Sequence, residues 1–500
     1  MMSDSVSSSR SSASTALVAA CGLIVAAPWF WPFLWGPLSA MWPDLFAWTM
    51  GALLIALLPR VHEHSGLVLA WGWLIAALGS SVLGMLQYFD LENGLYPWVA
   101  PTVPGYVIAN VHQLNMLATL LAVGLLCVWW LVLQRRLGAI HATWMSGLLL
   151  ATLAATASRT GMVHLMAISC LLLYWYPRHW KRVLLVLGVA WGFYAMASNA
   201  LPWLAWVTRG IDVERNLLGR FGADMGCHSR RVLWGNVVDL IAMKPWTGWG
   251  PGGLLYAHYI TAFEGLRFCE KLSNAHNLPL HLAVTLGVPV ATLVCAALGY
   301  ALLKFKPWAA IDPTERLCWA VLTLLGLHSL LEYPLWFGSF QLMWLLSVWQ
   351  IYRIRRQRSL TSENSAARGP VIVSAILLAG LAFVAWDYLK VSQLYLPERM
   401  RLERYREDTF NKSRDTVLFQ PHVLIAQVVA TPLNRDNAEL ILAGALASLH
   451  VAPDSRIIRR VIESALLLGR TDLAELHEAR YKAAWPKEYA QWKQGQAARP

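Results

Sequence analysis

Long uninterrupted runs of apolar residues constrain the folding of this chain more than any other feature. The runs from Val183 to Met196 and from Val371 to Ala385 contain no charged residue, and 57% of the 500 residues are hydrophobic while only 14% are charged. Soluble globular chains rarely have such a composition. Helices satisfy their own backbone hydrogen bonds in lipid, so these runs predict membrane-spanning helices. A transmembrane β-barrel is disfavoured because its strands would alternate apolar and polar residues.

Apolar stretches of roughly 17 to 25 residues predict about eleven transmembrane helices. The expected spans are 16–35, 41–58, 66–88, 113–133, 143–157, 161–177, 182–203, 279–303, 315–331, 336–352 and 370–390. The predicted fold class is therefore an all-α polytopic membrane protein. One large polar loop, residues 204–278, interrupts the spans.

A change of composition after Lys390 predicts a second domain. Residues 1–390 form the expected transmembrane domain, and residues 391–500 are rich in Arg, Glu and Ala. Within the second domain, apolar positions three and four residues apart predict short helices. These helices are expected at 395–408, 437–450, 455–468 and 471–484. Breaks at Pro, Asp and Gly between them favour helical hairpins.

The basic residues predict the orientation of the chain. Alternate short loops carry pairs such as Arg135 with Arg136 and Lys304 with Lys306, which is typical of cytoplasmic loops. The opposite set of loops (36–40, 89–112, 158–160 and 332–335) holds one basic residue, Arg159. Loop 204–278 and the C-terminal domain are expected on this outer side. The net charge of +12 follows from this bias, and no nucleic-acid partner is expected.

Two of the seven cysteines lie in the outer loop. An oxidising compartment would allow Cys227 and Cys269 to form a disulfide that closes a ring of about 43 residues. Two free thiols are the alternative. The other cysteines lie in or beside apolar spans and are expected to be small core residues.

Short motifs with polar residues gather on the predicted outer side. They are His112-Gln113-Leu114-Asn115, Ser158-Arg159-Thr160-Gly161, Arg231-x-x-Trp234 followed by Pro245-x-x-Gly248-x-Gly250, Ala275-His276-Asn277, and Leu331-Glu332-Tyr333-Pro334-Leu335-Trp336. In this order and on one face, the set resembles the O-antigen ligase superfamily. The Glu-Tyr-Pro-Leu-Trp segment resembles its protein O-oligosaccharyltransferase (PglL-like) branch. That branch usually has Gln-Pro-Asn where this chain has Gln113-Leu114-Asn115.

The resemblance implies an inverting glycosyltransferase of the bacterial inner membrane, with its active site facing the periplasm. Such an enzyme moves a preassembled oligosaccharide from undecaprenyl pyrophosphate to a Ser or Thr hydroxyl of a periplasmic protein such as a pilin. O-antigen ligases, which use a lipid A core acceptor, and O-antigen polymerases remain open alternatives. A transporter of lipid-linked glycans is less favoured, because no ionisable residues are expected deep within the spans.

The chemistry of this transfer indicates roles for the motif residues. Negative charge grows on the leaving pyrophosphate, and the planar guanidinium groups of Arg159 and Arg231 are suited to bind it. A snorkelling interfacial residue is the alternative interpretation of Arg159. Histidine is the residue most often used as a general base, and His276 is expected to activate the acceptor hydroxyl in this role. Residues expected to bind substrate are Gln113, Asn115, Arg230, Trp234, Lys244, Asn277, Glu332 and Tyr333.

Neither a metal ion nor a cofactor is expected at this site. Other transferases that use lipid-linked sugars hold a divalent cation with acidic pairs in an early outer loop. The first outer loop of this chain, residues 36–40, has no acidic residue. Arginines can supply the positive charge instead. The glycines at 248, 250, 252 and 253 are expected to form turns rather than to bind phosphate.

Overall fold

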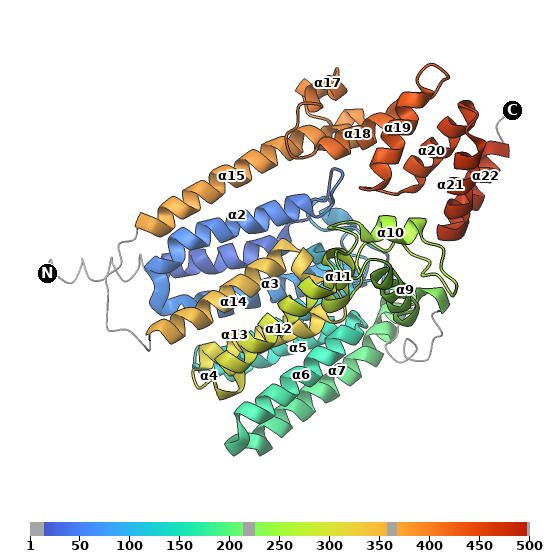
Figure 1. Cartoon of the computed structure of the whole chain (residues 1–500). Helices are drawn as coiled ribbons and strands as arrows, with labels where there is room; N and C mark the ends of the chain where they lie inside the picture. The colour runs from blue at the N-terminus through green and yellow to red at the C-terminus, as the bar shows by residue number, and fades with distance from the viewer. Residues whose placement is uncertain (1–14, 214–225, 358–367, 498–500) are drawn as a thin grey trace. The chain divides into compact units, whose positions relative to one another are not determined.

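The computed structural model describes residues 15–213, 226–357 and 368–497, and every regular element within these ranges is a helix (Figure 1). The remaining residues, including 214–225 of the predicted outer loop, lie outside this description. Contacts divide the chain into two compact units. The first unit comprises residues 1–34, 40–223 and 305–383, and the second comprises 35–39, 224–304 and 384–500.

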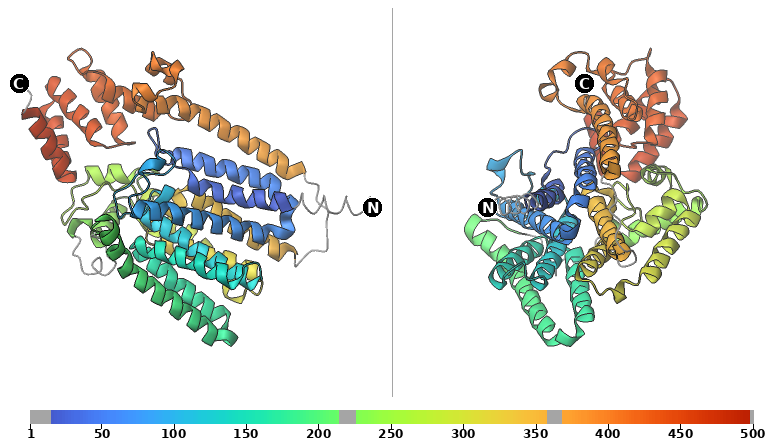
Figure 2. Two further views of the ribbon diagram at one scale, coloured as in Figure 1. Left: turned by 180° about the vertical axis from the view of Figure 1, so that it is seen from behind. Right: turned by 90° about the vertical axis from the view of Figure 1, so that its left-hand side faces the viewer.

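The first unit is a bundle of apolar helices that lie side by side (Figures 1 and 2). Its helices include α2 (Met41–Leu57), α3 (Ser65–Tyr88), α4 (Leu114–Leu133), α5 (Ala139–Ala155), α6 (Arg159–Trp175), α7 (Trp180–Arg209), α13 (Pro313–Ser329) and α14 (Gly338–Gln357). Helix α4 packs against α3, α5, α6 and α13, so it is the centre of the bundle. A Cβ atom on Gly124 of α4 would lie 2.6 Å from Cβ of Ala77, so this glycine allows α3 and α4 to approach closely.

The two ends of this bundle differ in chemistry. At one end, Arg355 forms an ion pair with the buried carboxylate of Glu315, and Arg353 donates to the Ser65 hydroxyl at 2.6 Å. These residues lie at the start of α3 and α13 and at the end of α14. The chain therefore brings the basic loops to one end and Arg159 to the opposite end, as the predicted alternation of loops requires.

Five helical segments in the described ranges are long and apolar enough to cross a membrane. They are Met41–Tyr88, Leu114–Leu133, Pro177–Arg209, Val288–Ala309 and Gly369–Tyr395. The first of these contains α2 and α3, joined by the 3₁₀ segment η2 (Leu58–His64). The chain is thus an all-helical membrane protein, and the count of about eleven spans stays a prediction. Helix α15 (Arg368–Ser392) contributes residues to both units.

The single helix predicted at 279–303 is wrong, because the structure divides it in two. Helix α11 (Leu278–Leu286) ends at Gly287, and α12 (Val288–Phe305) begins immediately after it. Gly287 has a φ of +87°, which is incompatible with a continuous right-handed helix. The neighbouring predicted span, 182–203, is longer than expected, since α7 continues to Arg209.

The Pro245-x-x-Gly248-x-Gly250 motif causes this break. The backbone N–H groups of Trp249 and Gly250 donate to the carbonyls of Val284 and Thr285 at 2.8 and 2.9 Å, and so cap the C-terminus of α11. In the other direction, the carbonyl of Pro245 accepts from the N–H of Val288 at 2.8 Å. The motif is therefore a clamp between backbones. This agrees with the expectation that its glycines form a turn rather than a phosphate site.

The C-terminal part of the second unit is a series of short helices packed as successive hairpins (Figures 1 and 2). They are α18 (Gln420–Ala430), α19 (Ala438–Leu449), α20 (Ser455–Leu467), α21 (Thr471–Ala484) and α22 (Pro486–Ala497). The predicted helices at 437–450, 455–468 and 471–484 match α19, α20 and α21. The helix predicted at 395–408 is wrong, since only short turns such as α16 (Glu403–Arg406) form there.

Part of the outer loop packs against these C-terminal helices. Tyr259 of α10 (Leu254–Ile260) has its hydroxyl 2.9 Å from Nδ1 of His477, and its ring stacks on Trp485 with the centroids 5.6 Å apart. Lys271 forms an ion pair with Glu488 at 3.6 Å. The contacts therefore group residues 224–304 with 384–500, which differs from a boundary at residue 390.

The clamp at the α11–α12 junction predicts a difference between two glycine substitutions. In G287A, the new Cβ would lie 2.2 Å from the Trp246 carbonyl oxygen, at a φ of +87°. We expect G287A to destabilise the protein by about 1–3 kcal/mol or more from backbone strain alone. The control is G299A, because Gly299 lies within α12 with open space around it. Thermal denaturation in detergent compares the two, and equal melting temperatures would contradict the clamp.

Candidate functional site

The end of the first unit that carries Arg159 is organised around the side-chain amide of Asn115. Its Oδ1 accepts from the Ser158 hydroxyl at 2.7 Å, and its Nδ2 donates to a carboxylate oxygen of Glu332 at 3.3 Å. Asn115 lies in the first turn of α4, Ser158 precedes α6, and Glu332 follows α13. Glu332 is buried, with only 5% of its surface exposed. One amide therefore joins residues from three of the predicted motifs.

The Ser158-Arg159-Thr160-Gly161 motif fixes the start of α6. Ser158 is the N-cap residue, and its hydroxyl accepts from the N–H of Gly161 at 3.1 Å. A Cβ on Gly161 would lie 2.8 Å from Cδ1 of Leu153 and 3.2 Å from Cβ of Ala118, so only glycine lets α6 approach its neighbours this closely. Arg159 is the first residue of α6 and is half-buried.

The His112–Asn115 motif and the Leu331–Trp336 motif also contribute residues at this end. The Gln113 Oε1 atom and the His112 Nε2 atom are buried and have no hydrogen-bond partner among the described residues. Burial lowers the pKa of His112 to about 4, so its imidazole is neutral at pH 7. The ring of Tyr333 stacks on Phe337 with the centroids 6.0 Å apart, next to the 3₁₀ turn η8 (Pro334–Trp336).

Sequence reasoning missed a second polar layer within the bundle. Thr119, His164 and His328 are fully buried, and the Thr119 hydroxyl lies within hydrogen-bond distance of both imidazoles. The expectation that the spans contain no deep ionisable residues is therefore wrong. Thr119 lies four residues after Asn115 and His328 four residues before Glu332, so helical spacing from the motif residues was the available signal.

In the second unit, α9 (Arg230–Met243) carries two of the predicted cations at its start. The hydroxyl of Ser229 caps the helix by accepting from the N–H of Val232 at 3.3 Å, and Arg230 and Arg231 follow it. The indole N–H of Trp234 donates to the carbonyl of Ala275 at 3.0 Å. Arg231 lies three residues before Trp234, a spacing that places the two on one helix face, and Arg231 is exposed.

His276 lies in a tight turn just before α11. Its φ is +50°, and its backbone N–H donates to Oδ1 of Asn274 at 2.8 Å. Asn277 is the N-cap of α11 and accepts from the N–H of Leu280 at 3.1 Å. The left-handed conformation of a residue other than glycine costs roughly 1–3 kcal/mol, and such residues cluster at functional sites. The imidazole of His276 is half-buried.

His281 and His258 have different surroundings. The His281 Nδ1 atom accepts from the N–H of Ala275 at 3.4 Å, so this ring supports the turn. His258 is fully buried, and burial lowers its pKa to about 3. A side chain without exposed surface cannot contact a substrate. Among these three, His276 is the one whose surface is partly open.

Lys244 follows the last turn of α9, on the opposite end from Arg230 and Arg231. Its ammonium group lies 4.2 Å from the centre of the Trp249 ring and is exposed. A cation near a helix C-terminus is stabilised by the helix dipole. This position gives Lys244 a structural reason to be present apart from substrate binding.

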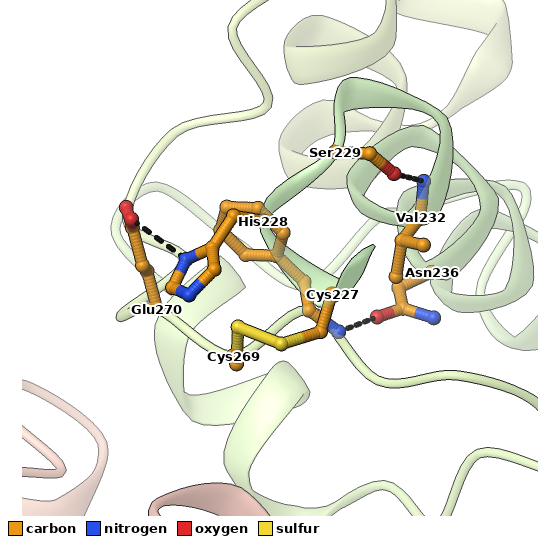
Figure 3. The surroundings of a disulfide bond; sticks show 8 residues. Cys227, His228, Ser229, Val232, Asn236, Cys269 and Glu270 are labelled. Carbon is orange, nitrogen blue, oxygen red and sulfur yellow. Dashed lines mark hydrogen bonds and ion pairs between the residues drawn. A yellow bond between two sulfur atoms is a disulfide. The ribbon is translucent and has the colours of Figure 1, made fainter. Parts of the chain in front are cut away.

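A disulfide joins the segment before α9 to the loop before α11 (Figure 3). Cys227 and Cys269, the pair predicted to bridge, are bonded, with their Cα atoms 5.5 Å apart. Beside the disulfide, Oδ1 of Asn236 accepts from the N–H of Phe268 at 2.8 Å, and His228 contacts Glu270 at 3.0 Å. Together these contacts fix the start of α9 against residues 266–270.

The same two sulfur atoms and His228 lie close enough together to hold a metal ion. Thiolates are the metal ligands, however, and sulfurs that are bonded to each other are not thiolates. In the oxidised form described here, this group does not fit a metal.

Arg159, Arg230, Arg231 and His276 share one structural feature, a position at or next to a helix N-terminus. Arg159 begins α6, Arg230 and Arg231 begin α9, and His276 directly precedes the N-cap of α11. None of these helices has an acidic residue in its first turn. A cation at a helix N-terminus is opposed by the helix dipole, typically by about 0.3–1 kcal/mol. An anion bound there would be stabilised by the side chain and by the dipole together.

Comparison with known families gives these features a context. The sequence profile of the family described as "O-Antigen ligase" matches residues 144–295, which contain the Arg159, Arg231 and His276 motifs. The profile described as "Virulence factor membrane-bound polymerase, C-terminal" matches residues 316–499, from α13 into α22. Together the two matches support the O-antigen ligase superfamily, which the sequence motifs resemble.

A curated relative supports the protein O-oligosaccharyltransferase branch of the superfamily. The chain is 25% identical over 320 residues to a protein named "General O-oligosaccharyltransferase" from Acinetobacter baylyi. The match covers 62% of this chain and 54% of the relative, so it spans about half the length of that protein. No solved structure matches the chain significantly.

The disulfide predicts sensitivity to reduction in the second unit. Removing a cross-link that closes a ring of this size costs about 2–5 kcal/mol. We expect the C227A/C269A double variant and the reduced wild type to unfold at a similarly lowered temperature in detergent. C295A is the control, because Cys295 is exposed and not bonded. If reduction leaves the melting temperature unchanged, the bridge does not hold this region.

Proposed function

We propose that this protein transfers a preassembled oligosaccharide from undecaprenyl pyrophosphate to a Ser or Thr hydroxyl of a periplasmic protein such as a pilin. The reaction would take place at the periplasmic face of the bacterial inner membrane. The observation that carries the proposal is the placement of Arg159, Arg230, Arg231 and His276 at the N-termini of three helices without an acidic residue in the first turn. This arrangement suits a ligand that becomes more negative as the reaction proceeds.

In the proposed mechanism, Arg159 and Arg231 bind the pyrophosphate of the donor. The acceptor oxygen attacks the anomeric carbon from the face opposite to the leaving group. Its bond forms as the bond from carbon to the pyrophosphate oxygen breaks, which inverts the configuration. The imidazole of His276 accepts the hydroxyl proton, and undecaprenyl pyrophosphate leaves with the negative charge that the arginines stabilise. The mechanism requires no metal ion or cofactor.

The remaining site residues divide into two groups in this proposal. Gln113, Asn115, Arg230, Glu332 and Tyr333 contact the donor or the acceptor, and Gln113 is partly exposed. Trp234 and Asn277 act through their hydrogen bonds to the backbone around His276. Lys244, whose ammonium group lies over the Trp249 ring, contributes positive charge without a direct contact to the reacting atoms.

The acceptor distinguishes this function from two other candidates. Similarity to a general O-oligosaccharyltransferase favours a protein acceptor. The two matching profiles are described as an O-antigen ligase and as a membrane-bound polymerase. They favour transfer to lipid A core or to a growing O-antigen chain. The donor chemistry is the same in all three reactions, so the site residues keep their roles.

Reconstitution separates these functions. The purified protein in liposomes is given an undecaprenyl-pyrophosphate-linked glycan with either a pilin or a lipid A core acceptor, with and without a chelator. We expect glycosylated pilin, at the same rate when chelator is present. Product on lipid A core alone would select the ligase, polymerised glycan the polymerase, and no product with any acceptor would overturn the glycosyltransferase proposal.

The proposed base predicts a large loss in the His276→Ala variant. A positioned general base contributes about 10²- to 10⁴-fold to the rate, so transfer by H276A should fall by that factor. His228→Ala is the control, since this exposed histidine lies in the same loop and contacts only Glu270 among the pairs described. Initial rates of pilin glycosylation measure both. Full activity of H276A would remove His276 from the mechanism.

A further inference from the structure

A second polar layer lies one helical turn beneath the Asn115 cluster. Thr119, His164 and His328 come from α4, α6 and α13, and none of the three has any exposed surface. The Thr119 hydroxyl oxygen lies 2.9 Å from Nε2 of His164, 2.7 Å from Nδ1 of His328 and 3.0 Å from the Asn115 carbonyl oxygen. The hydroxyl is therefore the centre of this layer.

The direction in which the Thr119 hydroxyl donates determines the tautomers of both rings. A hydroxyl group has one proton to donate, and the Asn115 carbonyl can only accept. When Thr119 donates to that carbonyl, both imidazoles must donate to the Thr119 oxygen. His164 then carries its proton on Nε2 and His328 on Nδ1. The other ring nitrogens, Nδ1 of His164 and Nε2 of His328, are buried and have no partner among the described residues.

The two layers are linked through the same three helices. Thr119 follows Asn115 by one turn and donates to its carbonyl, while the N–H of Glu332 donates to the carbonyl of His328 at 2.8 Å. His164 lies on α6, the helix that Arg159 begins. A shift of α6 or α13 relative to α4 therefore has to break the bonds of Thr119 as well as those of Asn115.

Filling a helix bundle with these polar side chains costs more free energy than filling it with apolar ones. A buried ring nitrogen without a partner loses its hydration, and apolar residues of similar size would pack the same space without that loss. Directed hydrogen bonds, in contrast, allow only one register between helices, which apolar packing does not ensure. The network is thus better suited to setting a precise arrangement than to stabilising the fold.

We propose that Thr119, His164 and His328 are positioning residues that hold Asn115, Arg159 and Glu332 in the arrangement that binds the lipid-linked donor. The inference rests on the proposed transferase function. Misplacing a substrate-positioning group by about 1 Å can lower activity by around 10²-fold. Loss of the Thr119 hydroxyl should therefore impair use of the donor and leave use of the acceptor protein unchanged.

Three variants of the full-length protein test this. Thr119→Val removes the hydroxyl at nearly constant volume, and Thr119→Ser keeps it. Thr152→Val is the matched control, because Thr152 is equally buried but its hydroxyl bonds only to the carbonyl of Leu148 in its own helix. We expect T119V to lower kcat/KM for the donor by about 10- to 100-fold, with KM for the acceptor unchanged. T119S and T152V should stay within about threefold of wild type.

The outcomes separate this inference from the proposed function. If wild type forms glycosylated pilin and T119V does so with unchanged donor kinetics, the positioning role is overturned while the transferase function stands. A T119V that only melts at a lower temperature, with normal kinetics of the folded fraction, also overturns it. If wild type forms no product, the proposed function fails first.

A spectroscopic readout does not depend on activity. In ¹⁵N-histidine NMR spectra of the protein in bilayers, signals lost in His164→Asn and His328→Asn identify the two rings. We expect His164 protonated at Nε2 and His328 protonated at Nδ1, and we expect both signals to shift in T119V but not in T152V. The opposite tautomers, or signals insensitive to T119V, would overturn the network.

Discussion

In lipid, each backbone N–H or C=O group without a partner costs several kcal/mol, and this requirement shapes the whole chain. Within a helix the backbone satisfies itself, so the demanding positions are the helix ends. The structure meets the demand locally at Ser158, Ser229 and Asn277, whose side chains cap α6, α9 and α11. At the C-terminus of α11, a distant segment, Pro245 to Gly250, supplies the missing donors.

These same helix ends carry the chemistry of the proposed site. Each cap is beside a residue of the proposed site: Arg159 follows Ser158, Arg230 follows Ser229, and His276 precedes Asn277. The caps satisfy part of the free N–H groups and fix the direction of the helix, while these residues lie at the positive end of the dipole. An anion bound at such an end is stabilised by the helix dipole, which connects the rules of helix termination to the binding of a pyrophosphate.

Several motif residues have structural duties that their spacing alone did not reveal. Gly161 permits the close approach of α6 to α4. Gly248 and Gly287 permit the contact between the segment Pro245 to Gly250 and α11. The indole N–H of Trp234 donates to the Ala275 carbonyl. Polar and aromatic motif residues are therefore not all substrate ligands. The division between residues that meet the substrate and residues that place them follows from which polar atoms the fold already uses.

The sequence by itself determined the helical membrane fold, the position of most helices within a few residues, the alternation of basic and outer loops, and the family, because hydropathy and short motifs are local properties. It also indicated the Cys227–Cys269 pair from their location in one loop. Only the tertiary structure decided the break at Gly287, the packing of Tyr259 against the C-terminal helices, and the buried contacts of Thr119 with His164 and His328. Each of these features depends on groups that are far apart in the chain. A pattern of neighbouring residues does not indicate which distant backbone or side-chain group will be the partner.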